Sequence, residues 1–155
     1  MTVAVSLHPL LDVLRVDFPY YTFTAGNEFA WRPDDQTIIY APHEPSAAQQ
    51  LLHELAHAEL LHTVYELDVE LLEREAWAWQ YAERLAKQYH LTLPRSVAED
   101  HLDTYRLWLW KRSQCPECHQ TGIQTTKNTY SCINCRYSWR VNEARKCNLK
   151  RYRLD

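Results

Sequence analysis

The chain has 155 residues, of which 46% are hydrophobic and 24% are charged. This composition argues against intrinsic disorder, and the length suits one modest domain with a small appendage. No apolar run is long enough to cross a membrane, and residues 1–16 lack the basic start of a signal peptide. We therefore expect a cytoplasmic protein with no membrane partner.

Charge is divided unevenly along the chain. Residues 1–110 contain 7 Lys and Arg against 17 Asp and Glu, whereas residues 111–155 contain 10 against 3. An acidic body with a basic end is typical of a protein with a nucleic-acid-binding appendage. The same split also fits two halves that attract each other, or an end that is simply well solvated.

The first third of the sequence predicts a helix over residues 7–16, ended by Pro19. Aromatic and β-branched residues then alternate between turn formers in three segments, residues 20–24, 28–32 and 36–41. This pattern predicts three short antiparallel strands, which form a small meander. The free edge of the last strand would suit backbone pairing with an extended peptide.

The pattern His-Glu-x-x-His follows, at His53, Glu54 and His57, in a stretch without Gly or Pro. Ser46, with Gln49 three residues later, resembles a capping box, so the helix is predicted to begin about two turns before His53. Positions four apart share a helix face, so the two histidines can bind one metal ion with Glu54 beside them. Two histidines on an apolar helix are otherwise ordinary core residues.

Residues 67–89 predict a second helix, in which the apolar side chains form one stripe at about 100° per residue. Glu75 lies in the middle of this stripe, whereas Glu73 points to solvent. A lone carboxylate in a buried stripe is costly unless it is paired or bound to a metal. We therefore predict that Glu75 is the third metal ligand, and that Asp68 supports a ligand or caps the helix.

Residues 53–57 and 73–79 together resemble the ImmA/IrrE-type metallopeptidases and the minimal gluzincins. In these families a helical Glu-Ala step after the His-Glu-x-x-His helix supplies the third zinc ligand. The resemblance covers roughly residues 36–86. His62 departs from the pattern, because it lies one position later than the additional histidine often present there. An aromatic residue also replaces the usual Asn after Glu-Ala.

The resemblance implies a zincin-like fold, with His53, His57 and Glu75 as ligands of a catalytic zinc ion and Glu54 as the general base. Three protein ligands leave one position of a tetrahedral zinc ion open for water, whose pKa falls to about 7. Glu54 would take the proton of this water and return one to the leaving amine. The predicted activity is a zinc-dependent endopeptidase acting on a protein or peptide substrate.

Two Cys-x-x-Cys pairs follow, Cys115 with Cys118 and Cys132 with Cys135, and β-prone segments surround them. At this spacing, in a chain expected to be cytoplasmic, four thiolates predict a structural zinc ion in a zinc ribbon, with disulfides as the alternative. So short a module has too little core to fold without metal. We expect two Zn²⁺ ions per chain, one catalytic and one structural.

The predicted fold class is α+β, with a zincin-like metallopeptidase domain over residues 1–112 and a zinc ribbon with a basic tail over residues 113–155. In the first domain the small antiparallel meander packs on the active-site helix and the glutamate helix. A further helix precedes the small β zinc ribbon.

The ribbon mixes basic and aromatic side chains, which suits phosphates and unpaired bases. The predicted contacts with single-stranded or double-stranded DNA, or with a DNA-bound protein substrate, are Lys127, Arg136, Trp139 and Arg140. Alternatively, the ribbon docks on the peptidase domain. Two other functions remain open: a SprT-like protease acting on DNA-bound proteins, whose third ligand is a later histidine, and a non-catalytic zinc-binding adaptor or regulator.

Overall fold

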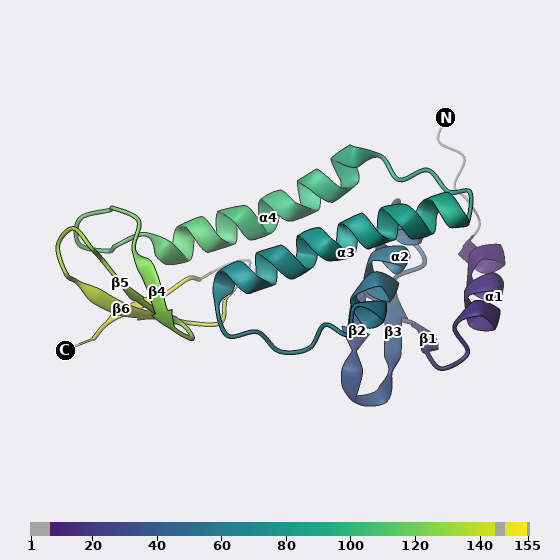
Figure 1. Ribbon diagram of the computed structural model, residues 1–155, viewed down its shortest axis with the longest axis horizontal. Coiled ribbons are helices and arrows are strands. Elements are labelled where there is room, and N and C mark those ends of the chain that lie inside the picture. The colour runs from purple at the N-terminus through teal and green to yellow at the C-terminus, as the bar shows by residue number, and fades with distance from the viewer. Residues whose placement is uncertain (1–6, 145–147, 155) are drawn as a thin grey trace. The chain divides into compact units, whose positions relative to one another are not determined.

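A computed structural model describes residues 7–144 and 148–154 of the chain (Figure 1). It contains α-helices and two small sheets, of three and four strands, which confirms the predicted α+β class. Among the described residues, no helix has both the length and the apolar character that a membrane span requires.

The chain divides into two compact units. The first unit comprises the residues up to Thr63 and the segment Arg74–Ala98, and the second comprises Val64–Glu73 and the residues from Glu99 onward. The second unit therefore includes more of the chain than the ribbon predicted from the cysteines.

The first unit begins with helical and β elements in the predicted order. They are α1 (Leu7–Asp17), β1 (Thr22–Ala25), β2 (Ala30–Arg32), the 3-10 turn η1 (Pro33–Asp35), β3 (Thr37–Tyr40) and α2 (Ala47–Glu59). The turn formers of the sequence lie between these elements, so the local pattern placed each strand within about two residues.

The sheet of the first unit is mixed, so the predicted antiparallel meander is wrong. Its strand order is β1-β3-β2, and β3 pairs antiparallel with β2 but parallel with β1. Strand β3 buries Thr37, Ile38 and Tyr40, whereas β1 buries only Phe23 and β2 is partly exposed. A strand that is buried on both faces belongs in the middle of a sheet, and this leaves β1 and β2 at opposite edges.

Helix α2 packs against this sheet and completes the core of the first unit (Figure 1). Leu51, Leu52 and Leu55 of α2 are fully buried, as is Ile38 of β3. The buried face of α2 follows the 3.6-residue helical period, which places His53 among these leucines.

Two long helices follow, α3 (Asp68–Gln88) and α4 (Arg95–Ser113). The apolar stripe predicted for α3 is confirmed, because Ala78, Trp79, Ala82, Leu85 and Ala86 are all buried. Glu75 is buried with them. Its carboxylate therefore lies in the buried, apolar face of α3 and not in solvent.

The second unit contains a four-stranded antiparallel sheet in the order β4-β5-β6-β7. The strands are β4 (Ile123–Thr126), β5 (Thr129–Ser131), β6 (Ser138–Val141) and β7 (Arg151–Arg153). The first three coincide with the β-prone segments of the sequence, whereas β7 lies in the predicted basic tail. We refer to residues 113–144 and 148–154 as the cysteine module.

Candidate metal centres

Helix α2 places His53 and His57 one turn apart on the same face. Ser46 is the N-cap residue, as expected, but its side chain makes no capping hydrogen bond, so the predicted capping box is wrong. Gln49 instead donates from Nε2 to the Thr92 carbonyl at 2.9 Å. The start of the helix was therefore predicted correctly, although the capping hydrogen bond on which the prediction was based is not formed.

The structure brings His53, His57 and Glu75 together. His53 Nε2 lies 3.0 Å from Glu75 Oε2 and 3.1 Å from His57 Nε2, and His57 Nε2 lies 3.4 Å from Glu75 Oε1. All three side chains belong to the first unit. The sequence predicted these three residues as ligands, and their nitrogen and oxygen atoms converge on one point.

The separations between these atoms fit the coordination sphere of a metal ion. Tetrahedral zinc with bonds of about 2.0–2.1 Å holds its ligand atoms about 3.3 Å apart. The observed separations of 3.0, 3.1 and 3.4 Å lie close to that value. Two imidazoles and a carboxylate are also a common donor set at catalytic metal sites. The residues present therefore fit a divalent metal ion.

The electrostatics of Glu75 favour the charged form that a metal requires. Burial by itself raises the pKa of this carboxyl group, but hydrogen bonds with His53 and His57 outweigh burial and hold the pKa well below its ordinary value. The face of the His53 ring also stacks on the Trp79 ring, with 4.1 Å between the ring centroids, and this contact restricts the orientation of the imidazole. These contacts fix the positions of the Glu75 carboxylate and the His53 ring.

Glu54, the predicted general base, lies next to His53 on α2. Burial is the largest effect on Glu54 and raises its pKa to about 7, with the charge of Glu75 adding to the rise. His57 and a hydrogen bond from the backbone N–H of Trp31 act in the opposite direction. A carboxylate with a pKa near neutrality accepts and releases protons readily at physiological pH.

His62 contacts the candidate ligand His57 but was not predicted to have a role in the site. Its Nδ1 atom lies 2.8 Å from His57 Nδ1. Burial, followed by the charge of His57, lowers the pKa of His62 to about 4, so its imidazole is neutral at physiological pH. The sequence did not indicate this contact, because helical periodicity does not bring residues five apart together.

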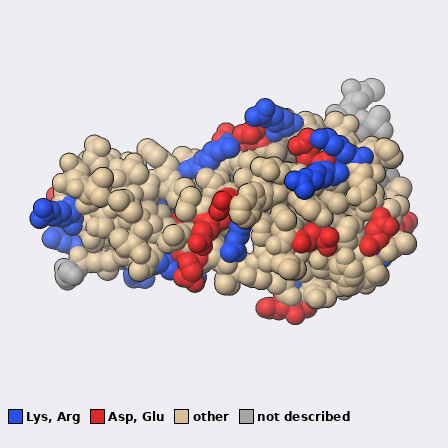
Figure 2. All heavy atoms as spheres, viewed as in Figure 1, with Lys and Arg blue, Asp and Glu red and all other residues tan. Residues whose placement is uncertain are grey.

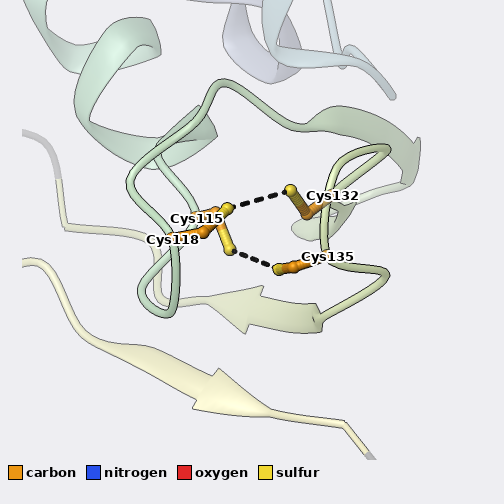
Figure 3. Close-up of side chains that lie close together, drawn as sticks. All are labelled: Cys115, Cys118, Cys132 and Cys135. Atoms are coloured by element: carbon orange, nitrogen blue, oxygen red, sulfur yellow. Dashed lines mark hydrogen bonds between the residues drawn. The ribbon is translucent and has the colours of Figure 1, made fainter.

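The four predicted cysteines also converge, in the cysteine module (Figure 3). The sulfur atoms of Cys115 and Cys135 are 3.6 Å apart, and those of Cys118 and Cys132 are 3.5 Å apart. A disulfide bond would need about 2.05 Å, whereas tetrahedral zinc with bonds of about 2.3 Å holds sulfurs about 3.8 Å apart. The cluster therefore fits a metal ion, and all four thiols are free.

Each Cys-x-x-Cys pair is shaped by the same turn. The first cysteine's carbonyl accepts from the backbone N–H four residues later, from His119 to Cys115 and from Arg136 to Cys132. His119 has φ 62° and Arg136 has φ 64°, both in the left-handed region. Non-glycine residues adopt this conformation at a cost, so the repeated geometry indicates that the surrounding structure enforces it.

Hydrogen bonds to the sulfur of Cys118 favour its thiolate form. A hydrogen bond from the backbone N–H of Gln120, followed by one from Asn134, lowers the pKa of Cys118 to about 6. The Asn134 amide nitrogen lies 3.6 Å from the Cys118 sulfur. Since the thiolate is the metal ligand, a lowered pKa at Cys118 favours metal binding.

The residues predicted to contact nucleic acid fall into two groups. Lys127, Arg136 and Arg140 are exposed, and Lys and Arg side chains lie on the surface of the cysteine module in the view of Figure 2. Trp139, however, is fully buried, and its Nε1 donates to the Arg112 carbonyl at 3.1 Å. The prediction that Trp139 contacts nucleic acid is therefore wrong, because its ring has no face left for a base.

A different aromatic residue is exposed on this sheet. Tyr152 on β7 is 43% exposed and pairs in register with Arg140 on β6. The Arg140 guanidinium lies over the Tyr152 ring, 5.1 Å from its centroid. An accessible ring beside an exposed arginine replaces Trp139 as the candidate position for base stacking.

Asp68 belongs to the second unit. Its carboxylate accepts hydrogen bonds from Arg112 and from the Tyr130 hydroxyl, all within the second unit. These contacts give Asp68 a structural role within the second unit, whereas its predicted role in supporting a metal ligand stays a prediction.

Comparison of the chain with models of protein families, with curated proteins and with solved structures gives no match.

Proposed function

We propose that the protein is a zinc-dependent endopeptidase of the gluzincin type. The observation that carries this proposal is the convergence of His53, His57 and Glu75, with Glu54 adjacent on α2. The resemblance to the ImmA/IrrE-type metallopeptidases assigns the same four residues. A SprT-like site would use a later histidine as third ligand, so the position of Glu75 favours the gluzincin type.

Each residue then has a defined role. His53, His57 and Glu75 would hold the zinc ion, and Glu54 would accept a proton from the attacking water and pass it to the leaving amine. Zinc in such a site activates water and polarises the peptide carbonyl at neutral pH. Burial raises the pKa of Glu54 to about 7, and a bound cation would lower it again, which would keep the carboxylate ionised and able to act as a base.

Metal content tests the site directly. Protein purified without added metal is expected to contain two zinc ions per chain in the wild type and one in Glu75→Ala. Glu73→Ala is the matched control, because Glu73 is an exposed glutamate on the same helix. One zinc ion in both the wild type and Glu75→Ala would contradict the peptidase proposal and leave a zinc-binding adaptor.

Cleavage of an unfolded protein substrate tests the activity. Glu54→Gln should keep both zinc ions and lose cleavage by roughly 10²–10⁴-fold, since it retains size but not basicity. A wild-type protein with two zinc ions and no cleavage of any substrate tested would favour the non-catalytic adaptor.

We further propose that the cysteine module is a zinc ribbon that recruits nucleic acid or a nucleic-acid-bound protein. The exposed residues Lys127, Arg136 and Arg140, together with Tyr152, support this proposal. Zinc held by four thiolates would leave that centre at about −2, so the neighbouring arginines must outweigh it.

Salt-dependent binding to a single-stranded oligonucleotide tests the recruitment. The slope of log K against log salt should become less steep by about 0.7 for each phosphate that Arg140→Ala no longer neutralises. Arg84→Ala is the matched control, because Arg84 is an exposed arginine of the first unit. Equal losses in the two variants, or no binding at low salt, would contradict a specific role for the module.

A further inference from the structure

In the turn that ends α2, the backbone hydrogen-bonds back to the last turn of the helix, which includes His57. The backbone N–H of Leu61 donates to Ala58 at 3.0 Å, and that of His62 donates to His57 at 3.0 Å. These two bonds define a Schellman motif, whose C′ position is normally a glycine because it requires a left-handed conformation. Here the position is occupied by Leu61, with φ 55°.

Nothing about the Leu61 side chain explains this conformation. The side chain is 76% exposed, so the left-handed backbone gains no hydrophobic burial in return for its cost. What the turn achieves is the placement of the next residue, His62, over the last turn of α2. Strained backbone of this kind is often found beside functional residues.

His62 is held by three hydrogen bonds. Its backbone N–H binds the His57 carbonyl, its Nδ1 lies 2.8 Å from His57 Nδ1, and its own carbonyl accepts from Trp31 Nε1 at 3.1 Å. Trp31 also binds the Glu54 carboxylate through its backbone N–H. His62 is therefore held by the candidate ligand His57 and by Trp31, a residue that also binds Glu54.

The position of one proton decides what this contact does. His57 presents Nε2 to His53 and Glu75, so Nε2 is the atom available to a metal. The ring proton of His57 must then be on Nδ1, where it points at His62 Nδ1. Metal-binding histidines commonly donate their second ring N–H to an acceptor that fixes both tautomer and orientation.

We propose that His62 is a positioning residue for the metal ligand His57. It accepts the Nδ1–H hydrogen bond of His57, and the left-handed turn at Leu61 holds it in place for that purpose. The inference rests on the proposed metal site, but it concerns a residue and a turn that this site does not itself require.

Zinc affinity of the full-length protein, measured by competition with a fluorescent chelator, tests the proposal. His62→Leu removes the acceptor and should weaken zinc binding at the site formed by His53, His57 and Glu75 by about 10–100-fold. His62→Asn can supply an oxygen near the position of Nδ1 and should restore affinity to within a few-fold of wild type. His8→Leu is the control, because His8 is an exposed histidine of the first unit.

A second measurement separates positioning from folding. Nitrogen-15 NMR of the zinc-loaded protein should show a slowly exchanging Nδ1–H of His57 in the wild type and in His62→Asn. This signal should be absent in His62→Leu, whereas far-UV circular dichroism should be the same for all variants. Leu61→Gly, which suits the left-handed turn, should keep both the signal and the affinity.

The outcomes distinguish this proposal from the proposed function. A wild-type protein that binds only one zinc ion overturns both. Two zinc ions with unchanged affinity in His62→Leu, or equal losses in His62→Leu and His62→Asn, overturn the role of His62 and leave the metal site standing.

Discussion

Asp68 and Arg112 form a buried ion pair in the second unit, with Arg112 Nε 2.6 Å from Asp68 Oδ2. Both side chains are only 1% exposed. The remaining hydrogen-bonding capacity is also used, since Tyr130 donates to the Asp68 carboxylate at 2.5 Å and Arg112 donates to Asn128 Oδ1 at 2.6 Å. Because these residues come from three separate segments, the pair joins the first turn of α3 to the end of α4 and to the cysteine module.

Removal of one charge from this pair should destabilise the second unit strongly. Asp68→Asn leaves Arg112 buried with no counterion, and breaking a buried pair in this way typically costs about 3–5 kcal/mol. Urea unfolding followed by tryptophan fluorescence measures the loss. The control is Asp103→Asn, because Asp103 pairs with Arg106 at 2.8 Å on the exposed surface of α4. That change should cost less than about 1 kcal/mol, and similar losses for the two variants would contradict the argument.

Gly122 should not tolerate a side chain. A Cβ atom there would lie 2.4 Å from a ring carbon of Trp139 and 3.0 Å from the Ser131 carbonyl oxygen. Since Trp139 is fully buried and cannot move aside, Gly122→Ala is expected to cost about 1–3 kcal/mol.

Thermal unfolding of Gly122→Ala beside Gly26→Ala gives the comparison. The Cβ at Gly26 would meet only Ile39 Cγ2, at 2.7 Å, and this side chain is partly exposed and able to rotate. The loss should therefore be clearly smaller at Gly26. A Gly122→Ala protein with the wild-type melting temperature would show that the packing around Trp139 is looser than described.

Local patterns predicted most of the helices, the strands β1 to β6 and the buried position of Glu75, because periodicity is a property of neighbouring residues. The parallel pairing of β1 with β3 was missed because pairing depends on which strand is buried on both faces. Asp68 and Arg112 are 44 residues apart, and no spacing rule connects them.

The sequence contained a signal against the Trp139 prediction but none for the role of His62. Trp139 lies between Ser138 and Arg140 on a strand, so the two-residue period places its ring on the face opposite to Arg140. An exposed basic face therefore implied a buried tryptophan. His62 required a left-handed residue at Leu61, and leucine gives no indication of that conformation.

Metal removal should unfold the sheet of the cysteine module. Its hydrophobic core consists of Tyr130, Trp139 and Val141 with Cys115 and Cys132, which is too small to be stable without a metal cross-link. The indole N–H of Trp139 is the probe, since its hydrogen bond to the Arg112 carbonyl should protect it from exchange. Addition of a strong chelator should abolish this protection and added zinc should restore it. Protection that survives complete loss of zinc would contradict a structural role for the metal.

Stability should fall at alkaline pH through Tyr89. Its hydroxyl donates to Asp17 Oδ2 at 2.8 Å, and burial together with this bond raises the pKa of Tyr89 above its ordinary value of 10.0. A group whose pKa is raised on folding stabilises the folded state fully below its unfolded pKa, and this contribution is lost as the pH rises above it. The free energy of unfolding should therefore decrease above about pH 10. Tyr89→Phe removes the hydroxyl, so the difference in unfolding free energy between wild type and Tyr89→Phe should be constant from about pH 7 to 9 and should shrink at higher pH. Urea titrations at a series of pH values measure this difference, and a difference that stays constant to about pH 11 would show that the bond to Asp17 does not form in solution.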